Sequence, residues 1–287
     1  MTIIDGIKIA EKILHSCKTR FIKLASKPTL AIIMVGDNPA SLTYIKKKRE
    51  AGEYVGINVD IHKFKTATQV EIVDLINELN DDNTVTGIIV QLPIPGIDEY
   101  IVCNAINPGK DVDGLNSSVL GDLWLSNTPK FIPATVKAIE YVLMEISEMK
   151  GIKYDKYIEG KNILIINRSQ IIGKPLSALM LSRNATVIIA HSKTKNIDDL
   201  ISISDIVVSG TGKENFINTQ SFKDDSVLID VGFNKTDKRI FGDVKKNIQC
   251  PAIAYLTPVP GGIGPIGVAC LIENVIEVAS RNPLYLS

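Results

Sequence analysis

Cysteine and histidine are scarce in this sequence, and neither is clustered. The 287 residues include four cysteines, at positions 17, 103, 250 and 270, and three histidines. No C-x-x-C pair occurs and the histidines are scattered, so the pattern indicates neither a metal site nor a disulfide framework. We expect free thiols in a reducing, cytoplasmic compartment, and no bound metal.

An excess of charge of one sign is also absent. The 32 basic and 32 acidic residues give a formal net charge of +0, so no global field favours nucleic acid or a membrane surface as a partner. The N-terminus lacks the pattern of a signal peptide, and we expect no apolar run of membrane-spanning length. With 45% hydrophobic and 22% charged residues, the composition is that of a globular protein.

The sequence does contain short apolar runs that alternate with helix-like segments. The runs are rich in isoleucine and valine, and they cover residues 30–35, 87–92, 162–166, 185–190, 205–209 and 227–231. Near-continuous apolar strands separated by helices predict parallel sheets that are covered on both faces. The predicted fold class is α/β.

Start signals and length together predict the organisation of the chain. Asn38 before Pro39 predicts a capped helix start, and Thr68 with Glu71 predicts a capping box. At ~150 residues per domain, the length suggests two domains. We expect an α/β domain over residues 1–117 and a Rossmann-like, doubly wound parallel sheet over 118–264. A helix within 135–149 should join them, and a final helix within 265–287 should pack back on the first domain.

The first candidate for chemistry is a pair on the helix that follows Pro39. Tyr44 and Lys48 are four residues apart and therefore share one helix face. An aromatic hydroxyl and an amine on one face can hold a flat ring and move a proton. The alternative is a solvated helix face, because residues 46–49 are all basic.

Two further candidates follow in the first domain. Gln91 ends the predicted strand 87–92, at the edge of the sheet where open α/β folds bind ligands. Asp111 and Asp113 flank one valine in the stretch KDVDG. The alternatives are a polar strand end for Gln91 and ordinary turn chemistry for the two acids.

A strand, loop and helix over residues 162–175 take the position of a nucleotide phosphate loop without the pattern G-x-G-x-x-G. Backbone N–H groups at the helix start can still bind pyrophosphate. The next strand ends near Ser192 and Lys193 with no acid, and Arg168 lies on the loop. A 2′-phosphate, and hence NADP, is favoured over NAD. The alternative is an ordinary α/β crossover with a polar rim.

A last stretch, TPVPGGIGP at 257–265, is dense in proline and glycine. Such a loop is rigid, and its backbone can be approached closely by a ligand. The alternative is a simple turn between domains.

Taken in order, these segments resemble the bifunctional methylenetetrahydrofolate dehydrogenase/cyclohydrolase family. The matching pieces are Tyr44 with Lys48, VQLPIP at 90–95, KDVDG at 110–114, RSQIIGKP at 168–175, HSKT at 191–194, DVGFN at 230–234, GDV at 242–244 and TPVPGGIGP at 257–265. Each piece is weak alone, but the ordered set is specific and covers nearly the whole chain.

The resemblance implies oxidation of 5,10-methylenetetrahydrofolate with NADP and hydrolysis of the methenyl product to 10-formyltetrahydrofolate. It implies a catalytic folate domain, an NADP domain, a cleft between them and a homodimer. The residues matching the family's catalytic set are Lys48 for proton transfer, Tyr44 stacked on the folate, Gln91 tuning the lysine and Asp113 holding the pterin. Cofactor contacts fall on Asn167, Arg168, Ser169, Ser192 and Phe233. Further substrate contacts fall on Pro260, Gly261, Gly262 and Gly264.

The chain departs from the family's pattern in its cofactor half. Asn167 stands where the family usually has glycine, and Phe233 stands for the common isoleucine. Ile266 and Gly267 replace the usual Met-Thr. Two other functions stay open from the sequence: a two-domain NADP dehydrogenase for another small substrate, of the shikimate type, and a non-catalytic nucleotide-binding module.

Overall fold

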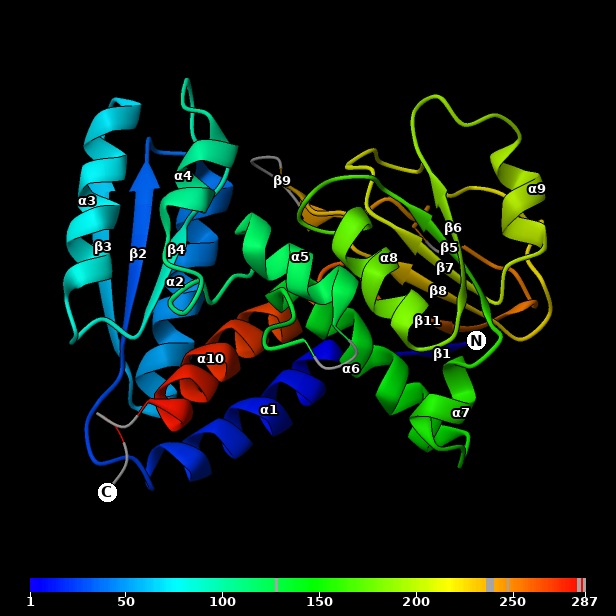
Figure 1. Cartoon of the computed structure of the whole chain (residues 1–287). Coiled ribbons are helices and arrows are strands. Elements are labelled where there is room, and N and C mark those ends of the chain that lie inside the picture. Colours follow the sequence, from blue (N-terminus) through cyan, green and yellow to red (C-terminus); the bar gives the residue numbers. More distant parts are fainter. Residues whose placement is uncertain (127–128, 236–239, 247, 283–284, 286–287) are drawn as a thin grey trace. The chain divides into compact units, whose positions relative to one another are not determined.

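The structure, a computed structural model, describes residues 1–126, 129–235, 240–246, 248–282 and 285 of the chain (Figure 1). The chain divides into two compact units. One consists of residues 10–134 and 268–287 and contains a three-stranded sheet; the other consists of residues 1–9 and 135–267 and contains a six-stranded sheet. We call them the three-stranded unit and the six-stranded unit.

The sheet of the three-stranded unit has the order β3-β2-β4, and all its strands are parallel. Its strands are β2 (Thr29–Val35), β3 (Asn58–Phe64) and β4 (Gly87–Val90). The helices α2 (Pro39–Val55), α3 (Gln69–Asp81), α4 (Glu99–Ala105) and α5 (Ser117–Leu125) lie in this unit, as does most of α1 (Gly6–Phe21). The parallel α/β architecture expected for the first half of the chain is confirmed.

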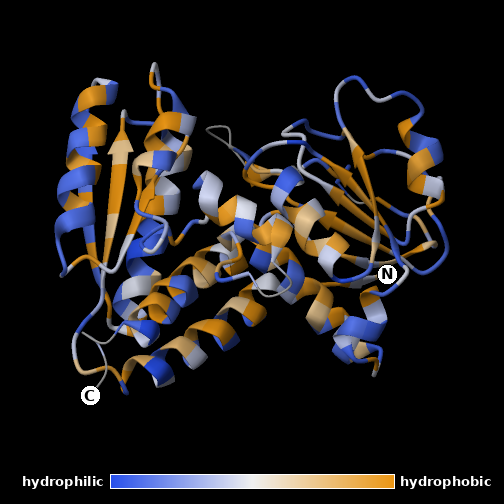
Figure 2. Ribbon diagram, viewed as in Figure 1, coloured by the Kyte–Doolittle hydropathy of each residue, from blue (hydrophilic) through white to orange (hydrophobic). Residues whose placement is uncertain are grey.

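The strands β2 and β4 were predictable from the sequence, and β3 was not. β2 and β4 are buried almost throughout, which is the near-continuous apolar pattern of a parallel sheet (Figure 2). β3 alternates exposed and half-buried residues and includes Asp60, His62 and Lys63. With these polar residues, β3 has too few apolar positions for the pattern that identified the other strands.

The sheet of the six-stranded unit has the order β1-β11-β8-β7-β5-β6, with every neighbouring pair parallel. Its strands are β1 (Thr2–Ile3), β5 (Asn162–Ile166), β6 (Thr186–Ala190), β7 (Ile206–Ser209), β8 (Ser226–Asp230) and β11 (Ile253–Leu256). The helices α6 (Ala134–Met149), α7 (Tyr154–Ile158), α8 (Gly173–Ser182) and α9 (Ile197–Ser202) belong to it, with a small pair β9 (Asn234–Lys235) and β10 (Ile240–Phe241). This is the predicted doubly wound parallel sheet.

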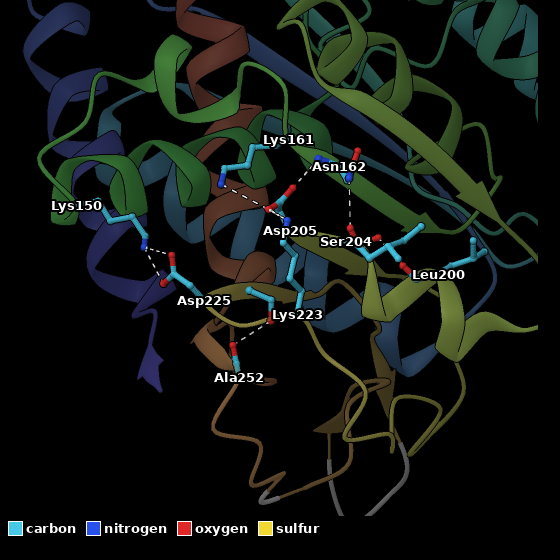
Figure 3. A network of polar contacts seen from close by, with 11 residues as sticks. Lys150, Lys161, Asn162, Leu200, Ser204, Asp205, Lys223, Asp225 and Ala252 are labelled. Carbon is cyan, nitrogen blue, oxygen red and sulfur yellow. Dashed lines mark hydrogen bonds and ion pairs between the residues drawn. The ribbon is translucent and has the colours of Figure 1, made fainter.

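A polar network fixes the amino ends of the central strands of this sheet (Figure 3). One oxygen of Asp205 accepts a hydrogen bond from the backbone N–H of Asn162 at 2.8 Å, and the other lies 2.7 Å from Lys223 Nζ and 3.6 Å from Lys161 Nζ. Asn162 begins β5 and Asp205 immediately precedes β7. The network therefore holds β5 and β7 in register at their amino ends, on the edge of the sheet away from the carboxyl ends.

The last helix, α10 (Ile263–Arg281), differs from the expectation that no segment could span a membrane. It has 19 residues and a mean hydropathy of 1.5, which meet the length and composition of a span, and 67% of the window is buried inside the protein. Residues such as Ile272, Val275 and Ile276 are fully buried. A helix that is apolar on most faces is typical of a protein core, and Asn274 Nδ2 donates to the Val112 carbonyl at 2.9 Å.

The boundary between the units lies elsewhere than expected. Residues 118–134 belong with the three-stranded unit, whereas the expected boundary followed residue 117. Met1–Ile9 belongs with the six-stranded unit, because Thr2 and Ile3 form β1 and pair with β11. β1 has only two residues and pairs with a strand that is distant in the sequence. Such a short strand leaves no periodic pattern, so the assignment of Met1–Ile9 to the six-stranded unit was not predictable.

Candidate functional site

The helix α2 places Tyr44 and Lys48 on one face. Asn38 caps the helix, and its side chain accepts hydrogen bonds from the backbone N–H groups of Ala40 and Ser41 at 2.9 and 3.2 Å, as the sequence predicted. Burial raises the pKa of the Tyr44 hydroxyl to about 12, so this group stays protonated at neutral pH and keeps its O–H donor.

Lys48 is held by Gln91, a contact between residues 43 positions apart. Lys48 Nζ donates to Gln91 Oε1 at 2.9 Å, and Gln91 Nε2 donates to the Leu92 carbonyl at 3.0 Å. The Gln91 backbone N–H donates to the Ile33 carbonyl at 2.8 Å, which fixes the end of β4 against β2. Burial lowers the pKa of the Lys48 ammonium, and the nearby Asp113 carboxylate partly offsets that effect. The lysine is therefore poised toward its neutral, proton-accepting form.

Asp113 sits in a turn that is built by its neighbour Asp111. The buried Asp111 carboxylate accepts from the backbone N–H groups of Gly114 at 2.9 Å and Asn116 at 2.7 Å. Burial raises the pKa of Asp111 to about 6. Gly114 has φ +77°, and a Cβ there would lie 2.9 Å from Pro133 Cα, so the turn requires glycine. The two acids thus divide the work: Asp111 builds the turn, and half-buried Asp113 is presented by it.

The six-stranded unit has a pocket of about 560 Å³ at the carboxyl ends of β5, β6 and β7. β5 pairs with β6 on one side and β7 on the other, so the chain reverses its direction of winding there. Such a switch point is where open α/β sheets bind their ligands. The described lining residues are Ile166, Asn167, Arg168, Ser169, His191, Ser192, Thr194, Ile197, Gly210, Thr211, Lys213 and Phe216.

Four of the five cofactor residues expected from the sequence line this pocket; Phe233 is not among the lining residues, and neither is Lys193. The described lining includes two permanent cations, Arg168 and Lys213, several hydroxyls and no carboxylate. That donor set fits an anionic, phosphorylated nucleotide. Lys213 was missed by sequence reasoning. Its signal is the stretch Gly-Thr-Gly-Lys that directly follows the predicted strand 205–209.

The backbone N–H groups at the start of α8, which we expect to face the pyrophosphate, make hydrogen bonds within the protein. The Gly173 N–H donates to Asn167 Oδ1 at 3.1 Å, and the Lys174 N–H donates to the Ser169 carbonyl at 3.0 Å. Pro175 has no N–H, and the Leu176 N–H donates within the helix start to Ile172 at 2.9 Å. These first donors are already used by the protein itself.

The proline- and glycine-rich stretch has a helix start within it. Gly261 has φ +102°, and its carbonyl accepts from the Gly6 N–H at 2.9 Å. Gly262 is buried, and a Cβ there would lie 2.5 Å from the Pro258 carbonyl oxygen. Pro260 precedes this bend, whereas Gly264 lies in the first turn of α10 rather than in a loop. The tight approach shows that the backbone at Gly262 needs glycine, and the substrate contacts of this stretch stay a prediction.

Two buried carboxylates that the sequence reasoning left unassigned organise the pocket rim. Asp243 Oδ2 accepts from Ser209 Oγ at 2.7 Å and from the Thr211 N–H, and its Oδ1 accepts from the Lys213 N–H at 3.1 Å. Asp230 accepts in turn from the Asp243 N–H at 3.0 Å. Burial raises the pKa of Asp230 to about 6. Asp243 therefore shapes a loop more than 25 residues before it, which no local pattern reveals.

Comparison with known proteins gives two matching family profiles. Residues 4–113 match the catalytic domain of tetrahydrofolate dehydrogenase/cyclohydrolase, and residues 133–283 match the NAD(P)-binding domain of the same family. The two profiles follow one another along the chain and together cover most of it.

Full-length relatives agree with the profiles. The bifunctional protein FolD of Rickettsia massiliae is 40% identical over 291 residues, covering 99% of this chain and 98% of that protein. The crystal structure of bifunctional FolD from Campylobacter jejuni is similar with a TM-score of 0.89 at 35% identity, covering 98% of this chain and 100% of that one. The Trypanosoma brucei enzyme, complexed with NADP cofactor and inhibitor, has a TM-score of 0.88 at 30% identity, covering 98% and 97%.

Proposed function

The chain belongs to the tetrahydrofolate dehydrogenase/cyclohydrolase family, and from that premise we propose how its own residues divide the two reactions. The protein is a bifunctional enzyme that oxidises 5,10-methylenetetrahydrofolate and hydrolyses the 5,10-methenyl product to 10-formyltetrahydrofolate. Membership of this family decides against the two alternatives that the sequence left open, a shikimate-type dehydrogenase and a nucleotide-binding module without activity.

The cofactor is NADP, and the pocket of the six-stranded unit fits it. Arg168 and Lys213 supply positive charge, Ser192 and Thr194 supply hydroxyls, and the described lining carries no carboxylate to repel a 2′-phosphate. When bound, NADP provides the ring that accepts the hydride. For this step the protein's task is orientation, because hydride transfer depends on the distance and alignment of the two carbons.

The cyclohydrolase step is assigned to Lys48, and the hydrogen bond between Lys48 Nζ and Gln91 Oε1 carries the assignment. Burial lowers the pKa of Lys48, and a methenyl cation beside the amine lowers it further by repulsion of like charges. The neutral amine then accepts a proton from the water that attacks the methenyl carbon. Gln91 suits this role because it is neutral, whereas a carboxylate would keep the lysine protonated.

Substrate orientation is assigned to Tyr44 and Asp113. The Tyr44 ring lies one helical turn from Lys48, where a flat pterin or aryl ring can stack beside the amine. Asp113 is an acceptor-only carboxylate, which suits the two-donor amino-pyrimidine edge of a pterin. Its turn is fixed by Asp111 and Gly114, so the acceptor is positioned before the substrate arrives.

Two assignments concern the protein as a whole. We propose a cytoplasmic homodimer that acts on a free reduced folate, without nucleic acid or membrane. The four cysteines are buried thiols, as expected of a reducing compartment. β6 is an edge strand of the six-stranded sheet with Ile189 40% exposed, which offers an edge for a second copy.

The test is spectrophotometry of the purified protein with methylenetetrahydrofolate and either NADP or NAD. We expect reduced NADP and transient methenyl absorbance, followed by its decay. The companion variant is Asp113→Ala: it should impair both reactions while NADP binding, measured by calorimetry, stays at the wild-type value. Full activity of a folded Asp113→Ala protein would show that KDVDG is only a turn.

A further inference from the structure

The loop between β5 and α8 satisfies its backbone donors with one side chain. Asn167 Oδ1 accepts hydrogen bonds from the Ser169 N–H at 2.7 Å and from the Gly173 N–H at 3.1 Å. Ser169 Oγ accepts from the Ile172 N–H at 3.1 Å. Backbone N–H groups of this kind, at the start of a helix that follows a β-strand, are those that usually bind a dinucleotide pyrophosphate.

The same side chain also reaches across the switch point. Asn167 Nδ2 donates to the Gly210 carbonyl at 2.5 Å, and Asn167 and Gly210 directly follow the neighbouring strands β5 and β7. A Cβ on Gly173 would lie 2.1 Å from the Asn167 carbonyl oxygen, so the loop and the helix start are in direct backbone contact. The oxygen of the amide thus accepts from the loop donors, and its nitrogen donates to the residue that follows the neighbouring strand β7.

We propose that Asn167 acts as an internal substitute for the pyrophosphate and thereby lowers the affinity of the pocket for dinucleotides. A neutral amide oxygen occupies two donors that an anion would otherwise take, so the diphosphate gains little in binding there. Affinity then depends mainly on the 2′-phosphate end of the nucleotide, where Arg168, Lys213 and the hydroxyls of Ser192 and Thr194 line the pocket. This inference rests on the proposed NADP site. The Asn167 amide lowers the affinity for NADP and NAD alike, so the preference for NADP comes from the contacts to the 2′-phosphate.

The experiment is calorimetric titration of wild type, Asn167→Gly and Asn167→Asp with NADP, NAD and adenosine 2′-monophosphate. The last probe keeps adenine, ribose and the 2′-phosphate but lacks the diphosphate. Asn167→Gly frees two donors, so NADP and NAD should each bind about 10- to 100-fold more tightly, since hydrogen bonds to charged groups are the strong ones. Adenosine 2′-monophosphate should bind within about twofold of wild type.

Asn167→Asp reverses the sign. Its carboxylate still accepts from the loop but adds a negative charge beside the diphosphate, so both dinucleotides should bind at least about tenfold more weakly. The matched control is Gln170→Ala, an exposed residue of the same loop, which should leave all three affinities unchanged. Thermal unfolding without nucleotide checks that each variant is folded, and Asn167→Ala, expected to act in the same direction as glycine, replaces any variant that is not.

Three outcomes decide the matter. Tighter binding of both dinucleotides by Asn167→Gly, with unchanged adenosine 2′-monophosphate, supports the proposal. Weaker or unchanged binding of both by Asn167→Gly, or an equal change for the mononucleotide, overturns it and leaves Asn167 as a scaffold of the loop. If wild type binds neither NADP nor adenosine 2′-monophosphate, the pocket assignment itself is wrong.

Discussion

Replacement of Gln91 by glutamate should switch off the proposed base while hardly changing the shape of the site. The substitution puts a carboxylate where the amide oxygen now lies, 2.9 Å from Lys48 Nζ. Two unit charges about 4 Å apart interact by about 4 kcal/mol at an effective dielectric constant near 20. One pKa unit corresponds to about 1.4 kcal/mol. With allowance for solvent at this half-buried site, the pKa of Lys48 should rise by about 1–2 units.

The sign follows from which form is active. The neutral amine is the base, and it is present above the lysine pKa. A raised pKa therefore moves the acid limb of the cyclohydrolase kcat/KM profile to higher pH by about 1–2 units, and activity at neutral pH falls about 10- to 100-fold. Dehydrogenase activity should fall less, because hydride transfer needs no proton acceptor on the folate.

The assay is hydrolysis of the methenyl compound, followed optically between pH 6 and 10 in buffers of constant ionic strength. Gln69→Glu is the matched control, because it replaces the same amide by the same carboxylate in the same unit. The Gln69 side chain accepts from the Asp98 N–H at 3.2 Å instead of contacting Lys48. Its profile should match wild type. An unshifted acid limb in a folded Gln91→Glu protein would refute the idea that Gln91 tunes Lys48.

Further predictions address the pocket and the turn. Arg168→Ala should weaken the binding of NADP far more than the binding of NAD in calorimetry, since the Arg168 cation is expected to bind the 2′-phosphate. Equal losses of affinity for the two cofactors would contradict that assignment. Asp111→Asn should flatten the pH dependence of unfolding by urea. Because burial raises the pKa of Asp111 from 3.8 to about 6, the folded state holds this proton more tightly, so its contribution to stability is present below the unfolded pKa and is lost as pH rises through about 6. Asp230 shifts in the same direction, so the slope should diminish without vanishing, and an unchanged slope would contradict the buried-carboxyl account.

Strand prediction succeeded where burial left its mark on the sequence. β5 is buried along most of its length, and the predicted range 162–166 is its observed extent. β11 was missed; it has four residues, two of them half-buried, and its pairing with β8 shifts register beside Ile253. β6 is half-exposed and was still predicted, because its run TVIIA is apolar, whereas the polar residues of β3 hide that strand from composition.

The residues of the candidate site could be predicted from the sequence, but the contacts between them could not. Spacing placed Tyr44 and Lys48 on one face, but only the sheet order β3-β2-β4 brings the end of β4, and with it Gln91, to the lysine. Asp111 was read with Asp113 as one acidic pair, whereas its hydrogen bonds make it the support of the turn. The departure at Asn167 was visible in the sequence; its double contact with the loop and Gly210 required the structure.

The most direct test of the proposed division of labour is Lys48→Met, which keeps the length of the side chain and removes the amine. General-base catalysis is typically worth about 10²–10⁴-fold, so hydrolysis of the methenyl compound should fall by that order. Oxidation of methylenetetrahydrofolate should persist in part, and methenyl absorbance should accumulate. If folded Lys48→Met hydrolyses the methenyl compound at the wild-type rate, Lys48 is not the base, and its helix face is a basic surface without a catalytic role.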